Sequence, residues 1–233
     1  MDNTAPSTVA RPRIGKHEDR SALRKLGAAV RTRLQANPRV QTLVDEGAEL
    51  YAVGEFLSPA ECDRFIGLVD EVARPSSVFD LDYDAQYRTS YSGDVSFADP
   101  FVRSISRRID DLLGIEPTYG EHLQGQRYLP GQQFKEHCDW FWTNASYWKG
   151  EKATGGQRSW TAMIYLNDVE AGGATNFVHL GLSVPPQRGA LLIWNNALPD
   201  GTVNYDTMHA GTPVEAGVKY VVTKWYRTRK WGG

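Results

Sequence analysis

The sequence predicts a mainly β protein with supporting helices. The prediction rests on the order of its helix and strand patterns along the chain. Capped helix patterns fill the first half of the 233 residues, and short β-branched and aromatic runs fill the second half. The length suits one large domain with its own core. The sequence contains no internal repeat or low-complexity segment. This order favours helices followed by an antiparallel β-sandwich or barrel that carries the chemistry.

The composition narrows the range of functions. A formal net charge of -2 and a pI near 6.2 give no support for nucleic-acid binding by the whole chain. Two cysteines make a disulfide framework unexpected and favour a reducing compartment. No apolar run approaches the roughly 20 residues that span a bilayer, and the first residues lack the apolar stretch of a secretory signal. We therefore expect a cytoplasmic protein without nucleic-acid or membrane partners, and the oligomeric state stays open.

The N-terminal segment differs in texture from the rest of the chain. Basic residues are frequent between positions 11 and 33, and apolar residues recur there at helical spacing, namely Leu23, Leu26, Val30 and Leu34. A helix packed on the main domain is favoured over a nucleic-acid or membrane contact. We predict an N-terminal extension over 1–49, with a disordered start and an amphipathic helix, and a main domain over 50–233.

Two helices are predicted at the start of the main domain. The first begins with Ser58 as N-cap, Pro59 at the first helical position and Glu61 three residues after the cap, which together make a capping box. The second begins after Asp99 and ends at Gly114, because glycine readily adopts the left-handed conformation that stops a helix. Beyond Gly114 the runs SWTAMIYL, GALLIW and KYVVTKWY predict strands.

The stretch EHCDWF places a histidine and an aspartate two residues apart. If residues 133–140 form a strand, His137 and Asp139 share one face, while Cys138 points to the other and packs. An imidazole and a carboxylate on one face can bind a divalent metal, but they can also form a simple hydrogen-bonded pair. A third ligand elsewhere in the chain is therefore needed to distinguish the two interpretations.

His209 is the strongest candidate for that third ligand. It is followed by a predicted strand in which alternation places Lys219 and Trp225 on the same face. Such a lysine suits an enzyme that holds a metal and anchors an anionic co-substrate. Two histidines and one carboxylate leave three octahedral positions open and suit Fe(II), with room for a bidentate 2-oxo acid and dioxygen. The other histidines, expected to have surface or packing roles, are His17, His122 and His179.

From about residue 50 to 227 the sequence resembles the Fe(II)- and 2-oxoglutarate-dependent dioxygenases of the prolyl 4-hydroxylase alpha-subunit type. The resemblance rests on segments in the same order: EFLSPAEC, RTS, RYLPGQQFKEHCDWF, GGQRSWTAMIYLNDVEAGGATNF, PPQRGALLIWNN and HAGTPVEAGVKYVVTKWYR. It implies a double-stranded β-helix, or jelly roll, as the core of the domain. It also implies that His137, Asp139 and His209 ligate iron and form the catalytic centre.

The resemblance further implies where the co-substrate and substrate bind. Lys219 would pair with the far carboxylate of 2-oxoglutarate, with Tyr128 and Thr175 as hydrogen-bond partners. Arg158 and Trp225 would lie along the path of a peptide substrate. The implied reaction is hydroxylation of an aliphatic C–H, above all C4 of peptidyl proline, with release of succinate and carbon dioxide and with ascorbate as reductant. Strict alternation places Arg158 and Thr161 on opposite faces unless a bulge intervenes.

Two alternatives to a peptidyl prolyl hydroxylase remain open at this stage. Phe134 stands where the family often has a tyrosine near the substrate, so a hydroxylase of a free amino acid or small metabolite is the second candidate. A catalytically inactive jelly-roll binding module is the third, and the intact triad and Lys219 argue against it. The aromatic segment 140–148 is either a wall of the jelly roll or a platform for an extended peptide.

Two loops near the expected site carry further expectations. Residues 144–156 are polar and contain glycines, as expected for a mobile lid. The acidic run at 80–84 is either a solvated loop or a border of the substrate site that favours cationic peptides.

Overall fold

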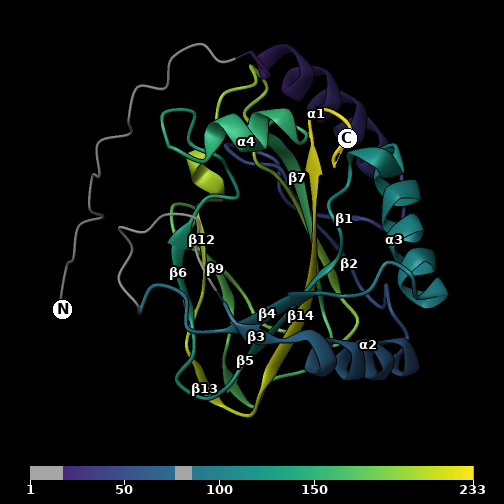
Figure 1. The fold of residues 1–233 in the computed structure, drawn as a ribbon, viewed down its shortest axis with the longest axis vertical. Helices are drawn as coiled ribbons and strands as arrows, with labels where there is room; N and C mark the ends of the chain where they lie inside the picture. Colours follow the sequence, from purple (N-terminus) through teal and green to yellow (C-terminus); the bar gives the residue numbers. More distant parts are fainter. Residues whose placement is uncertain (1–17, 77–85, 233) are drawn as a thin grey trace.

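A computed structural model describes residues 18–76 and 86–232 and contains two facing sheets flanked by helices (Figure 1). The large sheet has the strand order β1 (Gln41–Val44), β2 (Leu50–Val53), β11 (Leu191–Asn195), β7 (Arg158–Tyr165), β14 (Lys219–Arg227), β5 (Gln124–Tyr128), β4 (Tyr91–Asp94) and β3 (Arg74–Pro75). The small sheet has the order β10 (Leu182–Val184), β9 (Thr175–Phe177), β12 (His209–Gly211) and β6 (Phe134–His137). A third pair joins β13 (Val214–Ala216) to β8 (Ala171–Gly172). The predicted mainly β jelly roll is confirmed.

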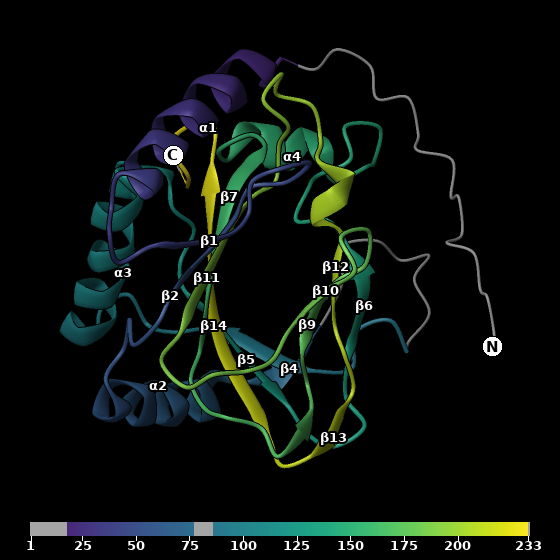
Figure 2. The ribbon, with the colours of Figure 1, turned by 180° about the vertical axis from the view of Figure 1, so that it is seen from behind.

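Three helices cover the outer face of the large sheet, and the small sheet faces its other side (Figure 2). These helices are α1 (Arg20–Gln35), α2 (Pro59–Val72) and α3 (Pro100–Leu113). The short helix α4 (Trp148–Ala153) and the 3-10 turns η1 (Pro117–Tyr119) and η2 (Tyr205–Thr207) complete the described helices. In residues 18–76 and 86–232, no helix is long and apolar enough to cross a membrane.

Local sequence signals set the start of α2 and both ends of α3 as predicted. At α2, the Ser58 hydroxyl accepts from the Glu61 backbone N–H, and the Glu61 carboxylate accepts from the Ser58 N–H at 2.7 Å. At α3, the Asp99 side chain caps the first turn, and Gly114 ends the helix with φ of 69°. Residues in the local sequence therefore fix the start of α2 and both ends of α3.

The predicted amphipathic helix in the N-terminal segment is α1, which packs on the domain. Val30 and Leu34 are buried in the core between the helices and the large sheet. Just before the helix, the buried carboxylate of Asp19 accepts from the backbone N–H of Gln157 at 2.9 Å and pairs with Arg229. Strand β1, also within residues 1–49, extends the large sheet beside β2. The described part of this segment therefore lies against the domain.

Alternation along the central strands separates two cores. On β7, Trp160, Ala162 and Ile164 face the helices, whereas Met163 and Tyr165 belong to the core between the two sheets. Burying each such large side chain contributes about 1.5–3 kcal/mol. The core between the sheets leaves space for a polar site near the ends of β6, β12 and β14.

The strand expected over residues 133–140 is shorter than predicted. Strand β6 ends at His137, and Asp139 lies in the bend that follows. The backbone N–H of Trp140 donates to the carbonyl of Cys138 at 2.8 Å, which closes a tight turn and ends the ladder. His137 and Asp139 therefore do not come together by strand alternation, although they do come together.

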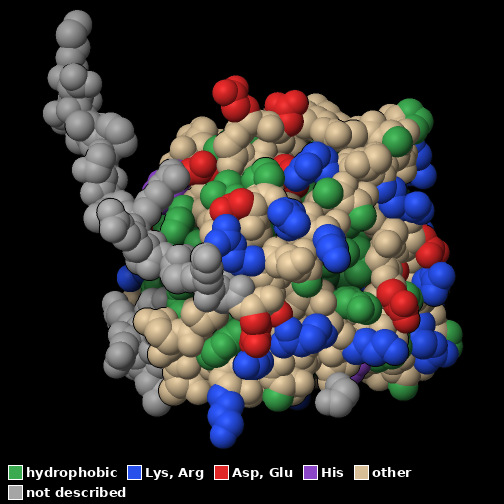
Figure 3. Space-filling view, turned by 90° about the horizontal axis from the view of Figure 1, so that it is seen from above, with side chains coloured by type: hydrophobic (Ala, Val, Ile, Leu, Met, Phe, Trp, Pro, Cys, Tyr) green, Lys and Arg blue, Asp and Glu red, His purple; other side chains and the backbone are tan. Residues whose placement is uncertain are grey.

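Charge is unevenly distributed over the surface despite the net charge of -2. Lys and Arg side chains predominate over carboxylates on the face seen from above (Figure 3). His17 and the acidic run at 80–84 lie outside the described residues.

Candidate active site

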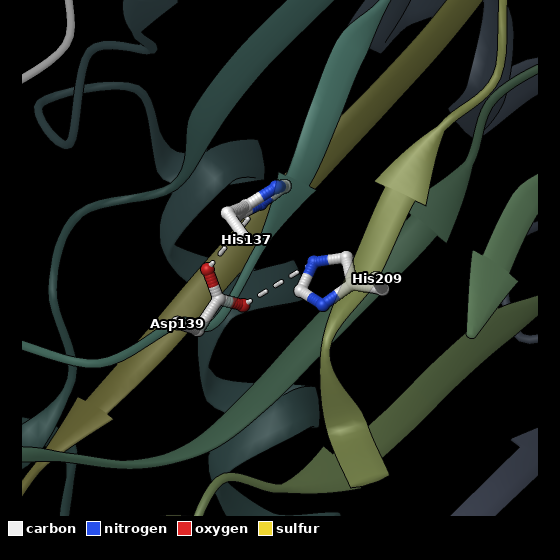
Figure 4. Close-up of side chains that lie close together, drawn as sticks. All are labelled: His137, Asp139 and His209. Atoms are coloured by element: carbon white, nitrogen blue, oxygen red, sulfur yellow. Dashed lines mark ion pairs between the residues drawn. The ribbon is translucent and has the colours of Figure 1, made fainter. Parts of the chain in front are cut away.

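The predicted triad is assembled at the mouth of the jelly roll (Figure 4). His137 ends β6, His209 begins β12, and the two are direct cross-strand neighbours in the small sheet. The Nε2 atoms of His137 and His209 lie 4.0 and 3.9 Å from the two carboxylate oxygens of Asp139. One ligand atom from each residue lies within 4.8 Å of the others. Two metal bonds of about 2.1 Å place their ligand atoms at most about 4.2 Å apart. The distances of 4.0 and 3.9 Å lie within that limit, and a small inward movement of the side chains would close the donor set around a single divalent ion.

Backbone carbonyls fix the orientation of both imidazoles. The Nδ1 of His137 lies 2.8 Å from the carbonyl of Lys135, and the Nδ1 of His209 lies 3.0 Å from the carbonyl of Thr207. Because a carbonyl can only accept, each Nδ1 carries the proton and each Nε2 keeps a free lone pair. This tautomer is the one that a metal-ligating histidine requires.

The electrostatic surroundings favour the protonation states of a metal site. Burial, followed by the neighbouring His209, lowers the pKa of His137 to about 3, so this imidazole is neutral near pH 7. Burial alone would raise the pKa of Asp139, but His209 and His137 in their protonated forms, together with the Arg158 guanidinium, hold it below its usual value. Neutral imidazoles and an ionised carboxylate are the forms that bind a cation.

Thr161 and Asn196 hold the Asp139 carboxylate in place. The Thr161 hydroxyl donates to Asp139 Oδ2 at 2.8 Å and accepts from the Asn196 amide at 2.9 Å. All three side chains are buried. Neither Thr161 nor Asn196 was predicted as a site residue, because a single threonine in a strand carries no pattern. The signal lies in strand pairing, which places Thr161 opposite Trp225.

Aromatic rings surround both imidazoles. The Phe134 ring stacks on His137 with centroids 3.6 Å apart, and Trp194 meets His209 edge-on at 4.8 Å. Rigid rings on each side restrict rotation of the ligands. Phe134 therefore contributes an apolar face where the family often has a tyrosine.

A narrow cavity extends from the triad to Lys219 and is also lined by Tyr128, Thr175 and Trp225. Lys219 is buried, burial lowers its pKa to about 7, and it has no ion pair with any residue in 18–76 or 86–232. Its ammonium group lies 5.2 Å from the centre of the Tyr128 ring. The structure thus brings Lys219, Tyr128 and Thr175 together in the cavity. A carboxylate bound there would balance the positive charge of Lys219.

Thr175 and Tyr128 are both engaged in hydrogen bonds inside the cavity. The Thr175 hydroxyl accepts from the Tyr165 hydroxyl at 2.7 Å. The Tyr128 hydroxyl donates to the Gln126 side chain at 2.7 Å. Tyr165 and Gln126 were not predicted, and they support the two predicted hydroxyl groups.

Arg158 and Trp225 meet at the outer edge of the cavity. The Arg158 guanidinium lies 4.0 Å from the centre of a Trp225 ring, and its Nε and Nη2 both donate to the Glu121 carboxylate at 2.8 Å. The pairing of β7 with β14 shifts between Tyr226 and Arg227, so a bulge allows Arg158 to lie on the same side as Thr161. Glu121 was not predicted, because a single glutamate in a loop has no distinguishing pattern.

Glu121 also connects this edge to α4 through Arg227. Arg227 is buried, donates to Glu121 at 2.9 Å, and donates to the carboxylate of Glu151 on α4 at 2.7 Å. The guanidinium groups of Arg158 and Arg227 both lie against the buried ring of Phe141, at 4.8 and 4.5 Å. Phe141 is therefore part of a wall, and the segment predicted as a lid includes a helix tied to the sheet.

Other candidate groups have packing contacts instead. His122 contacts Phe97 and Trp231 rather than the triad. Cys138, between the two triad residues, packs against a small core cluster as predicted. A hollow of about 930 Å³ between α2 and α3 is much larger than the cavity at the triad but contains none of its residues. Two arginines that line it, Arg108 and Arg188, are paired with the carboxylates of Glu61 and Asp63. The chemistry therefore resides in the narrow cavity.

A jelly roll with two histidines and one carboxylate at its mouth defines the class of metal-dependent oxygenases with open coordination positions. The family described as the 2OG-Fe(II) oxygenase superfamily matches residues 123–227, a range that includes the triad and Lys219. This stretch of the chain therefore matches the superfamily. Prolyl 4-hydroxylase alpha subunits are among the proteins to which the chain is similar.

Two relatives illustrate the similarity. The prolyl 4-hydroxylase subunit alpha-1 of Rattus norvegicus is 37% identical over 176 residues, which cover 72% of this chain and 33% of that protein. The subunit alpha-3 of Homo sapiens is 36% identical over 176 residues, which cover 73% of this chain and 32% of that protein. The chain thus spans about a third of the length of these relatives.

Solved structures share the fold. The viral collagen prolyl hydroxylase of Paramecium Bursaria Chlorella virus-1 in its 2OG complex has a TM-score of 0.60 and 24% identity, covering 76% of this chain and 95% of that chain. A prolyl hydroxylase from Trichoplax adhaerens, in complex with a hypoxia inducible factor peptide fragment, has a TM-score of 0.58 and 15% identity, covering 92% and 94%. At these identities the similarity establishes the fold alone.

Proposed function

We propose that this protein is an Fe(II)- and 2-oxoglutarate-dependent dioxygenase that hydroxylates peptidyl proline at C4 and releases succinate and carbon dioxide. The observation that carries the proposal is the placement of His137, Asp139 and His209 around one point, at the end of a cavity that holds the buried Lys219. Relatives at 36–37% identity are prolyl 4-hydroxylase subunits, which supports proline as the target.

Each group has a distinct task in this proposal. His137, Asp139 and His209 would hold Fe(II), which when bound supplies the activation of dioxygen. Lys219 would fix the far carboxylate of 2-oxoglutarate through a charge-assisted hydrogen bond. The hydroxyl groups of Tyr128 and Thr175 would position the same carboxylate. Ascorbate would serve as the reductant that restores oxidised iron.

Arg158 and Trp225 would bind the substrate chain at the outer edge of the cavity. The Glu121 carboxylate accepts from Nε and Nη2 of Arg158, which holds the guanidinium over the Trp225 ring. Fixing both side chains before binding reduces the entropy lost when a peptide docks. A peptide or protein substrate is therefore favoured over a small metabolite.

Paired yields test the proposal. We expect hydroxyproline and succinate to form in equal amounts with proline-rich peptides and Fe(II). We also expect proline within a peptide to react far faster than free proline, because remote contacts position the reacting carbon. Equal rates for free and peptidyl proline would overturn the peptidyl assignment. Full coupling to a small metabolite, with no peptide oxidised, would establish the metabolite hydroxylase instead.

A further inference from the structure

Three aromatic rings form a cluster on the surface, which we call the aromatic platform: Phe97, His122 and Trp231. The Phe97 and His122 rings stack with centroids 5.3 Å apart and planes 14° apart, and Trp231 meets His122 edge-on at 4.7 Å. The Phe97 side chain is 42% exposed. Among residues 18–76 and 86–232 it is the one large apolar side chain that is exposed. His122 is also exposed. Flat rings are thus presented to solvent in a fixed arrangement.

Strand β5 runs from the cavity toward the platform. Tyr128 and Gln126 line the cavity, and Gln124 continues that side of the strand. Leu123 points the other way into the core beneath the helices. His122 lies just before the start of β5, directly after Glu121, whose carboxylate holds Arg158 at the outer edge of the cavity.

Two arginine side chains make polar contacts between the cavity and the platform. The Arg88 guanidinium donates to the Gln124 side chain at 3.1 Å and lies 4.7 Å from the centre of the Phe134 ring beside the triad. Glu121, the neighbour of His122, holds Arg158 over Trp225. The platform thus adjoins the edge of the cavity where a substrate chain would enter.

The distance along β5 can be compared with the length of a peptide. Gln126 and His122 are four positions apart along the chain, and at about 3.4 Å per position an extended chain spans roughly 14 Å between them. A polyproline II chain rises about 3.1 Å per residue, so the same distance takes about four residues. Proline-rich chains in this conformation dock on aromatic surfaces, because their rings pack on flat faces at little conformational cost.

We propose that the aromatic platform of Phe97, His122 and Trp231 is a remote subsite that binds a proline-rich segment of the substrate about four residues from the oxidised proline. The proposal rests on the peptidyl hydroxylase function proposed above. It assigns to that function a preference for chains long enough to reach from the triad to the platform.

Peptides of matched sequence and different length test the subsite. One set carries a target proline with two residues on each side, and two further sets extend it by six proline-rich residues on the N-terminal or the C-terminal side. For the wild type we expect one of the two extensions to raise kcat/KM by roughly three- to tenfold, the size of one aromatic contact. Phe97→Ala and His122→Ala should each remove that gain. His179→Ala, which changes another exposed histidine on the turn between β9 and β10, should retain it.

Fluorescence anisotropy of the same labelled peptides gives a second reading that does not depend on turnover. Tighter binding of one extended peptide to the wild type, lost in Phe97→Ala and kept in His179→Ala, supports the subsite. No gain from either extension, or a gain that survives in both platform variants, overturns it while leaving peptidyl hydroxylation standing. Absence of hydroxylation in every peptide contradicts the proposed function, and the binding comparison still decides whether the platform is a subsite.

Discussion

Lys219 has a pKa that burial lowers to about 7, so its charge depends on pH near neutrality in the absence of an anion. A bound carboxylate favours the ammonium form, so 2-oxoglutarate binding above pH 7 must take up a proton. We therefore expect the affinity for 2-oxoglutarate to fall between pH 7 and 9, by up to about tenfold per unit, and to level off below pH 7. Titration calorimetry across this range measures it. A 2-oxo acid without the second carboxylate is the control and should lack this contribution.

Removing the ammonium group tests the same residue directly. Lys219→Ala should raise the 2-oxoglutarate requirement at least about tenfold, because a hydrogen bond to a charged group contributes roughly 1.5–3 kcal/mol. Iron affinity should change little. Lys25→Ala, at an exposed lysine of α1, serves as the control. Succinate formation with an unchanged 2-oxoglutarate requirement would remove Lys219 from this role.

Thr161 lies one contact away from the predicted metal. Thr161→Val keeps the shape of the side chain but removes the hydrogen bond to Asp139, so the carboxylate loses its fixed orientation. We expect Fe(II) affinity to fall about 10- to 100-fold, the usual cost of losing such support. Equilibrium dialysis measures the affinity, with Thr32→Val on α1 as the control. Wild-type affinity in Thr161→Val would show that the hydroxyl does not position the carboxylate.

Site residues with a distinctive type and spacing in the sequence could be predicted. Site residues whose role depends on their tertiary contacts could not. His137, Asp139 and His209 could be singled out because their chemistry and spacing indicate a metal. Lys219 followed from strand alternation. Thr161 and Glu121 gain their importance only from groups brought near by strand pairing and loop closure, which no local pattern encodes.

At the scale of elements, α4 is attached to the large sheet by the ion pair of Arg227 with Glu151. Arg227→Gln or Glu151→Gln should loosen α4 while leaving the sheet intact, because the lost bonds join these two elements. We expect faster hydrogen exchange in residues 148–153 in both variants. Arg64→Gln, which breaks the exposed pair with Asp99, should leave exchange in α4 unchanged. Unaltered exchange in both variants would mean that other contacts hold the helix.

The ends of elements were predictable where local side chains set them. The capping box at Ser58 indicated the start of α2, and Asp99 and Gly114 indicated the two ends of α3. The end of β6 depends on the turn at Cys138, and the bulge near Arg158 depends on the register of β14. Neither has a residue that signals it in its own strand, so the predicted strand over 133–140 was too long.

At the scale of the whole molecule, α1 contributes to the main core rather than only covering its surface. Leu34 is fully buried between the helices and the large sheet. Leu34→Ala should lower the free energy of unfolding by about 2–5 kcal/mol, because it leaves a cavity. Arg24→Ala, on the exposed side of the same helix, should change it by less than about 0.5 kcal/mol. Urea denaturation compares the two, and equal small effects would mean that α1 is dispensable for stability.

The central claim is that His137, Asp139 and His209 together hold Fe(II), and anaerobic equilibrium dialysis with 2-oxoglutarate tests it most directly. We expect the wild type and the His179→Ala control to bind iron, and each alanine variant of the triad to lose that binding while keeping a wild-type circular dichroism spectrum. Each substitution removes one of three protein ligands, so the remaining two should not retain the ion. Iron binding and turnover equal to wild type in all three folded variants would contradict the claim.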